Sequence, residues 1–409
     1  MPCVVITLAF HREISALRMS KFLRPGSAQR EYSGRMRAYM DNAATTPLRP
    51  EALSAMLPAF SDRFGNPSGV HSVSRDARRA LEDSRETVAN LLGAAPSEVV
   101  FTSGGTESDN MAILGVGGRR GKVVTTAVEH AAVRESCNSL GAVVVPVSSD
   151  GVVNLDALAS ELSSDVSLVS VMLVNNEVGV VQPLAEVAAL VREKAPGALL
   201  HTDAVQAFAW LDVADLVRVA DLVSVSAHKF GGPKGTGALV VRDGASIRPV
   251  MFGGGHERGR RPGTQNVAGA LGMAAAMAAT VATRDETLKR VSALRDRLAD
   301  GILSSMDGVV ETGARDLKVA GNCHLRFDGV EGEALLVLLD EMGVSASAGS
   351  ACSSGATEAS HVLLAMGLTR EEASSSVRLS LGYATSRDEV DLSLEVIPKA
   401  VSQLRRSPG

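Results

Sequence analysis

Polar and titratable residues directly follow five apolar, β-branched segments in the first half of the sequence. These clusters occupy residues 103–107, 129–130, 175–177, 203–206 and 226–229. The carboxyl ends of parallel strands meet at one edge of a sheet, where open α/β sheets bind their ligands. We therefore expect the five clusters to form a single site.

The first cluster combines a glycine turn with the start of a helix. Ser103-Gly104-Gly105-Thr106 follows an apolar strand pattern and precedes a helical one. Free backbone N–H groups and the positive end of a helix dipole bind anions, so the turn suits a phosphate group. The same residues equally suit a plain turn with Ser103 or Thr106 as the helix cap. The chain contains no GxxxxGK[ST] motif, and nucleotide hydrolysis is therefore not supported.

Lys229 ends the last of these clusters, in Ala227-His228-Lys229 before a glycine-rich turn. A lysine in that position is often simply solvated. At the rim of a cleft, however, a lysine can lose its proton and form a Schiff base with an aldehyde cofactor. Asp203, at a neighbouring strand end, would then pair with a pyridinium nitrogen. Lys229, Asp203 and the phosphate turn together make the minimal set for pyridoxal phosphate.

The elements that must position these residues follow an alternating pattern. Apolar segments alternate with helical periodicity between residues 72 and 245, which is typical of βαβ units. Strands are expected at residues 98–102, 122–126, 142–147, 168–174, 198–202, 222–225 and 237–241. Helices are expected at residues 72–92, 107–115, 156–162 and 184–194. The expected fold class is α/β, with a mostly parallel seven-stranded sheet flanked by helices.

The sequence changes character after residue 283, where long helical patterns occur at residues 286–303 and 387–405. We expect a large cofactor-binding domain over residues 54–285. A smaller α+β domain would combine residues 39–53 with residues 286–405. Residues 345–360 are almost wholly small and polar, so a mobile loop of the smaller domain is expected there. Residues 1–38 are expected to be an extension, either disordered or upstream of the natural translation start.

Charge and hydropathy limit the class of partner. A formal net charge of -5 gives no field that would attract nucleic acid or an anionic membrane, so small metabolites and proteins are expected. The Ala- and Gly-rich residues 267–282 are too few for a membrane span and predict a buried helix.

The four cysteines contain no CxxC pair, which argues against a disulfide framework or a metal site. A reducing compartment, the bacterial cytoplasm, is expected; an organellar transit peptide in the extension is the alternative. Cys137 and Cys323 fall in helix and strand patterns and are expected to be packed thiols. Cys352 stands in the small polar segment without apolar periodicity, where an exposed nucleophile is expected.

Several ordered motifs stand between Tyr39 and the C-terminus. They are Met40-Asp-Asn-Ala-Ala-Thr-Thr-Pro47, Phe64-Gly-Asn-Pro-Ser68, Phe101-Thr-Ser-Gly-Gly-Thr-Glu-Ser108, Val174-Asn-Asn-Glu-Val-Gly179, Ala227-His-Lys229, Gly253-Gly-Gly-His-Glu-Arg-Gly259 and Gly349-Ser-Ala-Cys352. In these motifs the chain resembles the cysteine desulfurases, class-V aminotransferases with the fold-type I architecture of pyridoxal phosphate enzymes. The resemblance implies conversion of L-cysteine to L-alanine, with formation of a persulfide on Cys352.

The resemblance also implies roles for the cofactor site. Lys229 would hold the cofactor, Asp203 would keep the ring nitrogen protonated, and Gln206 would contact the ring phenolate oxygen. His130 would stack on the ring and move protons. Four residues, Gly105, Thr106, Ser226 and His228, would form the phosphate end of the site.

Substrate and partner contacts are implied in the same way. Asn176 and Arg378 would bind the substrate carboxylate, with Asn176 also at the cofactor. Thr264 would reach a phosphate in the other subunit, which implies a homodimer. Pro262 stands where relatives often have serine, and this departure weakens the inference for Thr264.

The long-loop motif around Cys352 favours direct transfer of sulfur to an acceptor protein, for iron–sulfur cluster assembly or tRNA thiolation. No metal site is expected beyond a transient iron–sulfur ligand role for Cys352. Competing interpretations are a selenocysteine lyase, another fold-type I enzyme such as an aminotransferase, and a non-catalytic scaffold that kept the fold. The presence of both Lys229 and Cys352 argues against the scaffold, and Cys352 argues against the aminotransferase.

Overall fold

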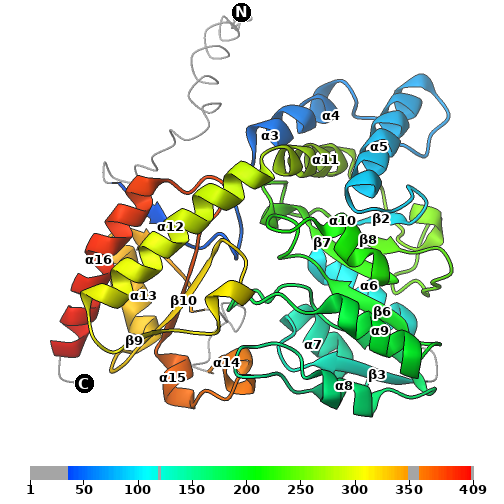
Figure 1. The fold of residues 1–409 in the computed structure, drawn as a ribbon. Helices are drawn as coiled ribbons and strands as arrows, with labels where there is room; N and C mark the ends of the chain where they lie inside the picture. The colour runs from blue at the N-terminus through cyan, green and yellow to red at the C-terminus, as the bar shows by residue number, and fades with distance from the viewer. Residues whose placement is uncertain (1–35, 118–120, 349–358, 407–409) are drawn as a thin grey trace, which may run out of the picture.

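A seven-stranded sheet forms the centre of the larger part of the molecule in the computed structural model, which describes residues 36–117, 121–348 and 359–406 (Figure 1). Its strand order is β2-β8-β7-β6-β5-β3-β4. In that order the strands are Val99–Thr102, Gly237–Val241, Leu222–Ser226, Leu199–Asp203, Val166–Ser170, Lys122–Thr126 and Val143–Val145. β8 is antiparallel to both of its neighbours and the other pairings are parallel. The predicted seven-stranded, mostly parallel sheet is thus confirmed.

Helices cover both faces of this sheet, because its central strands are apolar on both sides. Val223 and Val225 of β7 pack with α5 (Ser72–Leu91), α8 (Leu155–Glu161), α9 (Leu184–Lys194) and α11 (Val267–Ala282). Leu222 points to the opposite face and packs with α6 (Gly105–Gly117) and α7 (Ala131–Asn138). Short helices α3 (Pro50–Met56), α4 (Pro58–Ser61) and α10 (Val213–Leu216) complete this part of the chain.

A second hydrophobic cluster lies around a three-stranded antiparallel sheet with the order β12-β10-β9. These strands are Ser376–Ser380, Asn322–Phe327 and Val309–Glu311. The long helices α12 (Arg284–Ser305) and α16 (Arg387–Arg406) pack on it with α13 (Gly332–Glu341), while α14 (His361–Ala365) and α15 (Arg370–Ser374) lie towards the large sheet. A two-stranded parallel pair joins β1 (Ala38–Tyr39) to β11 (Val344–Ser345). Both ends of the chain therefore contribute to this second cluster.

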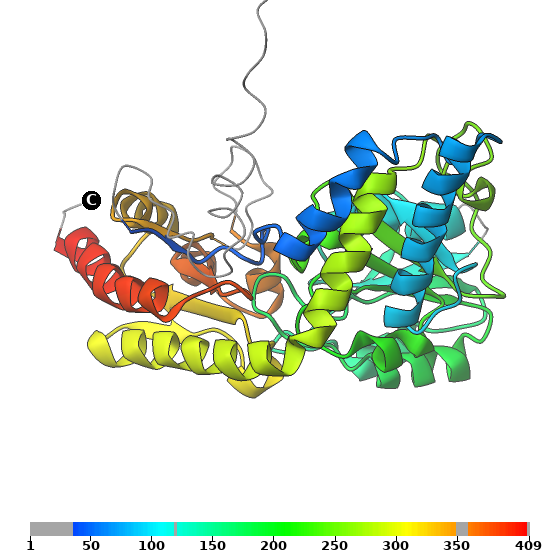
Figure 2. The ribbon, with the colours of Figure 1, turned by 90° about the horizontal axis from the view of Figure 1, so that it is seen from above.

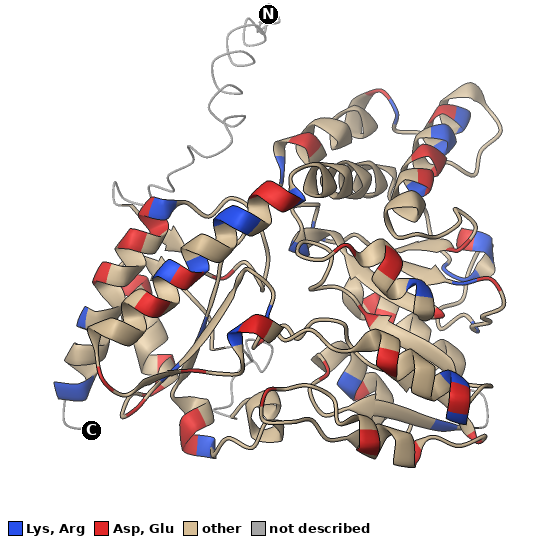
Figure 3. Cartoon of the chain, in the orientation of Figure 1, with Lys and Arg blue, Asp and Glu red and all other residues tan. Residues whose placement is uncertain are grey.

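The two parts of the molecule are connected through α11 and α12, which meet at Thr283 with a bend of 72°. Figure 2 shows α12 running from the end of α11 across to the smaller sheet. α11 carries no charged residue, whereas α5, α12 and α16 show charges along their exposed sides (Figure 3). Among the described residues, no helix taken singly has both the length and the apolarity of a membrane span; α11 and α12 meet that test only as a bent pair.

Most predicted elements lie within two residues of their observed bounds, including the buried helix at residues 267–282. The start of α6 differs by two residues, and the end of β5 shows the largest departure. α6 begins at Gly105, two residues earlier than expected, because the glycine turn is already part of its first turn. β5 ends at Ser170 and not at residue 174, although Leu173 still donates a backbone hydrogen bond to Asp203 at 2.9 Å. Of the predicted extension, residues 1–35 lie outside the described part of the chain, and Ala38 already belongs to β1.

Candidate active site

Lys229 lies where the large sheet meets the N-terminal segment of the chain. It follows β7 in a single 3-10 turn, Ala227–Lys229. Its Nζ donates hydrogen bonds to the carbonyl oxygens of Ala43 at 2.5 Å and Ala44 at 3.0 Å. Gln206 Nε2 donates to the same Ala43 oxygen at 2.8 Å. Two of the side chains that were predicted to bind the cofactor, Lys229 and Gln206, therefore converge on one backbone carbonyl group.

Asp203 ends β6 and is 5% exposed. One carboxylate oxygen accepts a hydrogen bond from the backbone N–H of Val205 at 2.9 Å. Burial raises the pKa of this carboxyl group, and the nearby His130 and Lys229 oppose the rise. An anionic Asp203 thus needs a positive partner, and a protonated pyridine nitrogen is such a group.

His130 is the N-cap of α7, and its Nδ1 accepts a hydrogen bond from the backbone N–H of Ala132 at 3.1 Å. Burial lowers the pKa of the imidazole, which favours the neutral ring. Because Nδ1 accepts, the proton of the neutral ring is assigned to Nε2. Asp203 and Lys229 both influence the His130 pKa, so the three side chains form one electrostatic group.

The predicted phosphate turn has the backbone that its sequence suggests. Gly104 adopts a φ of 153°, which a side chain would disfavour, and α6 begins at Gly105. A Cβ atom on Gly105 would lie 2.8 Å from Val205 Cγ2, so the close packing excludes a larger residue. Thr106 is in the first, exposed turn of α6, where N–H groups have no partner within the helix. This arrangement suits a phosphate.

Two further residues were predicted to bind the phosphate: Ser226, which lies beside this turn, and His228, which lies beside Lys229. Ser226 ends β7, and a Cβ on Gly104 would be 3.7 Å from its Oγ. His228 Nδ1 lies 3.2 Å from Thr45 Oγ1, and burial, followed by the charge of Lys229, lowers its pKa to about 4. Thr264 is exposed on the surface of the single chain.

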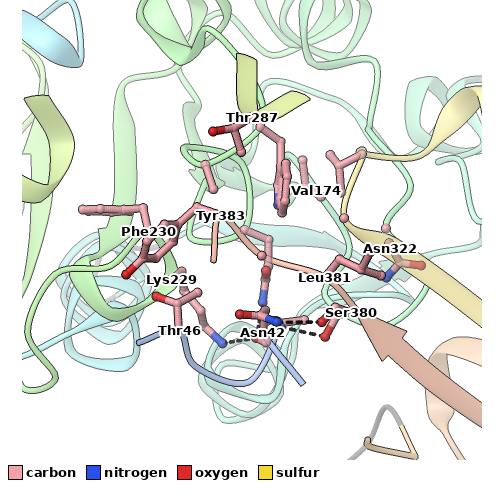
Figure 4. Close-up of a pocket in the computed structure, with 18 of the residues that line it drawn as sticks. Asn42, Thr46, Val174, Lys229, Phe230, Thr287, Asn322, Ser380, Leu381 and Tyr383 are labelled. Atoms are coloured by element: carbon pink, nitrogen blue, oxygen red, sulfur yellow. Dashed lines mark hydrogen bonds between the residues drawn. The ribbon is translucent and has the colours of Figure 1, made fainter. Parts of the chain in front are cut away.

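Arg378, in β12, is the predicted substrate ligand and is only 2% exposed. Its guanidinium group donates to the carbonyl oxygen of Asn176 at 2.7 Å and to Asp41 Oδ1 at 2.9 Å. Asn176 also lines a pocket together with Gln206 and Lys229. Figure 4 shows Lys229 pointing towards Asn42 and the end of β12 in this pocket. Asn176 and Lys229 thus line one pocket, and Arg378 is hydrogen-bonded to the backbone of Asn176 beside it.

Cys352 and residues 349–358 lie outside the described part of the chain, but both flanks of the segment are held near Arg378. Ser347 exchanges two backbone hydrogen bonds with Arg378, at 2.7 and 3.2 Å. At the other flank, Ser360 Oγ donates to the buried carboxylate of Glu177 at 2.5 Å. Glu177 follows Asn176 directly, so both flanks are attached next to the predicted substrate ligands.

The two cysteines in the described part of the chain, Cys137 and Cys323, are packed thiols, as the sequence predicts. Cys137 and Cys323 are both 0% exposed, and neither forms a disulfide bond. Burial raises the pKa of each thiol to about 12. Neither is a nucleophile at neutral pH.

A buried polar network between α6 and the sheet was not predicted. His201 lies between Ser170 Oγ at 2.8 Å and Ser224 Oγ at 3.0 Å, and its Nε2 is 3.6 Å from Asp109 Oδ1. Burial raises the pKa of Asp109, with the nearby Asp203 as a further cause. A charged residue inside an amphipathic helix usually faces water, so the sequence carries no signal for this role. The network lies near Asp203, since the charge of Asp203 contributes to the raised pKa of Asp109.

The donor set fits pyridoxal phosphate, with a helix N-terminus for the phosphate, a buried carboxylate for the ring nitrogen and a lysine for the aldehyde. Fold and site together define a pyridoxal phosphate enzyme of fold type I. The family model of the class-V aminotransferases matches residues 38–392, and the chain belongs to this family.

Two curated relatives and one solved structure specify the activity. An "IscS-like cysteine desulfurase" of Mycobacterium tuberculosis is 46% identical over 90% of this chain and 98% of the relative. "Cysteine desulfurase IscS" of Dictyoglomus turgidum is 41% identical over 90% and 95% of the two chains. A solved "NIFS-LIKE PROTEIN" is 37% identical, with a TM-score of 0.84 over 90% of this chain and all, 100%, of its own. The activity of the chain is that of a pyridoxal phosphate-dependent cysteine desulfurase.

Proposed function

We propose that this chain forms alanine from L-cysteine in a homodimer, holds the released sulfur as a persulfide on Cys352, and passes it to an acceptor protein. The observation that carries the proposal is the attachment of both flanks of the Cys352 segment beside the substrate-binding candidates. Ser347 is bonded to Arg378, and Ser360 is bonded to Glu177. A segment tethered in this way reaches the substrate from a short distance and still has ten residues, 349–358, between its described flanks.

The residues of the site divide the chemistry among them. Arg378 binds the substrate carboxylate, which fixes the amino acid beside Lys229. Lys229, which would hold the cofactor in the resting enzyme, has the amine that can remove the proton from the substrate Cα. The bound cofactor supplies an electron sink for the resulting carbanion. Asp203 keeps the ring nitrogen protonated, and a neutral His130 is able to donate or accept a proton above the ring.

Sulfur transfer then needs only the thiolate of Cys352. The thiolate attacks the substrate sulfur, and an S–S bond forms as the bond between sulfur and the substrate Cβ breaks. The electron pair of the broken bond stays with Cβ, which takes up a proton, and L-alanine leaves. The persulfide remains on Cys352 until an acceptor thiol takes its outer sulfur.

The proposal of a homodimer is supported by exposed apolar side chains on two neighbouring loops. Phe64 and Val70 are 71% and 86% exposed, and Phe252 is 88% exposed. A hydrogen bond of 2.9 Å between His256 Nε2 and Ser68 Oγ joins the two loops. Large exposed apolar side chains on adjacent loops are typical of a protein interface. Thr264 follows Phe252 on the same exposed segment, which would carry it to the site of a second copy.

The domain division at residues 54–285 and at residues 39–53 with 286–405 forms part of the proposal. It is supported by the separate hydrophobic clusters around the two sheets. We place the enzyme in the bacterial cytoplasm, because Cys352 must remain a thiol between turnovers and the cytoplasm keeps thiols reduced. The proposed acceptor is a scaffold protein of iron–sulfur cluster assembly.

The activity test compares wild type with Cys352→Ala, using Cys137→Ala as the control for loss of a buried thiol. Purified wild type is expected to be yellow, to form alanine and sulfide in equal amounts with a reductant, and to carry an added sulfur atom on Cys352 by mass spectrometry. Cys352→Ala should keep the colour and lose the added sulfur and the turnover. Full sulfide release by Cys352→Ala would refute the persulfide role.

The dimer and the acceptor are tested separately. Sedimentation should give a dimer, and Phe252→Asp should shift it towards monomer. A variant with a shortened 349–358 segment that retains Cys352 should still form the persulfide and transfer less sulfur to a scaffold. Undiminished transfer would contradict direct delivery by the loop.

A further inference from the structure

A row of four polar residues crosses the small antiparallel sheet. His324 of β10 is directly opposite Arg378 of β12. Next to His324, Thr312 donates its backbone N–H to the His324 carbonyl oxygen at 3.0 Å. Next to Arg378, Ser347 forms an antiparallel backbone bridge with Arg378. Side chains directly opposite each other in antiparallel strands point to the same face, with Cβ atoms about 4.5 to 5.5 Å apart. The side chains of these four residues are therefore neighbours along one line.

The row lies on the face of the sheet that points away from the small hydrophobic cluster. Cys323 and Leu325, the neighbours of His324 along β10, belong to that cluster, so His324 points to the other side. On this side the sheet packs against residues 176 and 177 of the larger part. Arg378 donates to the Asn176 carbonyl oxygen, and Asn322 Nδ2 donates to that of Glu177 at 2.8 Å.

All four residues are buried, and each has at least one side-chain polar atom without a hydrogen-bond partner among the described residues. Thr312, His324, Arg378 and Ser347 are 2%, 0%, 2% and 5% exposed. Within the described residues, no hydrogen bond is made by Thr312 Oγ1, Ser347 Oγ, Arg378 Nε or either ring nitrogen of His324. Buried polar groups in native proteins are nearly all paired, so a group of unpaired atoms in one row indicates bonds that form in the working enzyme.

The imidazole ring of His324 can form two of these missing hydrogen bonds. Burial lowers the pKa of His324 to about 3, so its imidazole is neutral, with one nitrogen that accepts and one that donates. Arg378 has five N–H donors, of which two are used on Asn176 and Asp41. If Nε–H is also held, one N–H remains on each terminal nitrogen, and this pair fits a carboxylate in bidentate fashion.

We propose that His324 is a positioning residue for Arg378: one ring nitrogen accepts the Nε–H of Arg378 while the other donates its N–H to Thr312 Oγ1. The ring thereby fixes the plane of the guanidinium group that receives the substrate carboxylate. This inference rests on the proposed role of Arg378. Ser347 Oγ, on the other side of Arg378, is the competing acceptor for the same Nε–H.

The test uses the cofactor-loaded enzyme and two measurements: KM and kcat for alanine formation from L-cysteine, and the Kd of the product L-alanine from the absorption change of the cofactor. His324→Leu removes both ring nitrogens. Losing a hydrogen bond to a charged group that acts in ground-state binding should raise KM and Kd about tenfold or more and change kcat less than about twofold. His324→Asn and His324→Gln each restore an acceptor at one of the two ring positions, and at least one should recover most of the affinity.

Cys323→Ala is the matched control, because it lies on the same strand and points into the hydrophobic cluster. It should lower the thermal midpoint and leave KM and Kd unchanged. An effect of His324→Leu confined to the thermal midpoint would reduce His324 to a structural role. If Ser347→Ala loses affinity and His324→Leu does not, Ser347 accepts the Nε–H of Arg378, and the proposal is overturned.

Arg378→Gln separates this inference from the proposed function. If Arg378→Gln weakens L-alanine binding and His324→Leu does not, only the positioning role fails. If Arg378→Gln leaves the Kd unchanged, the role of Arg378 in substrate binding fails, and the positioning role falls with it. Should His324→Leu not fold, ¹⁵N-histidine spectra of wild type decide: L-alanine should shift the His324 ring resonances, and unmoved resonances overturn the proposal.

Discussion

Glu129 is a buried carboxyl group next to the active site, and a single isosteric change tests its protonation state. It is 0% exposed, and its Oε1 accepts hydrogen bonds from Thr126 Oγ1 at 2.6 Å and Met172 N–H at 3.0 Å. Its Oε2 is buried without a partner among the described residues. Burial raises the pKa of Glu129 from 4.5 to about 8. At neutral pH the folded protein therefore keeps this proton, whereas the unfolded chain loses it.

The contribution of Glu129 to the stability of the protein therefore decreases as the pH rises. The stability contributed by a group with a raised pKa is fully present below the unfolded value of 4.5 and is lost as the pH rises towards about 8. Within that window the Glu129 contribution to the free energy of unfolding falls by about 1.4 kcal/mol per pH unit. Glu129→Gln keeps the size and the acceptor oxygen but has no proton to lose. Between pH 5.5 and 7.5 the variant should therefore gain at most about 3 kcal/mol relative to wild type.

The assay is urea unfolding at both pH values, followed by the fluorescence of Trp210, the single tryptophan of the chain. Trp210 packs against both hydrophobic clusters, so its emission reports on the loss of either one. Glu135→Gln is the control, because its side chain is 63% exposed on α7, which begins two residues after Glu129. A difference between Glu129→Gln and wild type that is the same at both pH values would refute the reasoning, as would a wild type that is more stable than the variant at pH 7.5.

Three other outcomes are expected. Glu257→Gln should lower the free energy of unfolding by at most about 3 to 5 kcal/mol in urea titration, because it removes the buried ion-pair partner of Arg85 at 2.7 Å and leaves only the half-exposed Glu82 at 3.0 Å; a loss near zero would contradict this. Ser360→Ala removes the hydrogen bond to Glu177. The variant should form the Cys352 persulfide more slowly, as followed by rapid-quench mass spectrometry, and should bind substrate as wild type does, as followed by absorption. An unchanged rate of persulfide formation would show that this flank needs no tether. Iodoacetamide should not label Cys137 in the native protein, because burial raises the pKa of this thiol to about 12. Fast labelling of Cys137 would contradict its assignment as a buried thiol.

The large sheet and the rim of its carboxyl ends were predictable from the sequence. Short, largely apolar segments such as those ending at Asp203 and Ser226 are local signals, because buried strands of a parallel sheet are rich in apolar residues. The glycine turn at Gly104 and Gly105 is equally local, since its backbone angle and close packing demand that residue type. The predicted roles of the side chains at this rim stay predictions, and three of these residues, Asn176, Gln206 and Lys229, line one pocket.

What the sequence did not reveal depends on contacts between distant segments. The carbonyl groups of Ala43 and Ala44 meet Lys229 across 186 and 185 positions of the chain. No periodicity marks such a pairing. The row through His324 was hidden for the same reason, because three short strands must first find their register before its members become neighbours. Buried carboxyl groups such as Asp109 look like ordinary surface residues of a helix until the sheet covers them.

The pairing of β1 with β11 has a consequence for how the chain is made. Ala38 and Tyr39 leave the ribosome early, but their partners Val344 and Ser345 follow only after some 300 further residues. At about 5 to 20 residues per second, this strand waits roughly 15 to 60 s for its partner during synthesis. The large sheet, complete by Val241, has time to form first. In that interval Met40 has no hydrophobic cluster to enter, so the nascent chain exposes an open strand edge that a chaperone can bind.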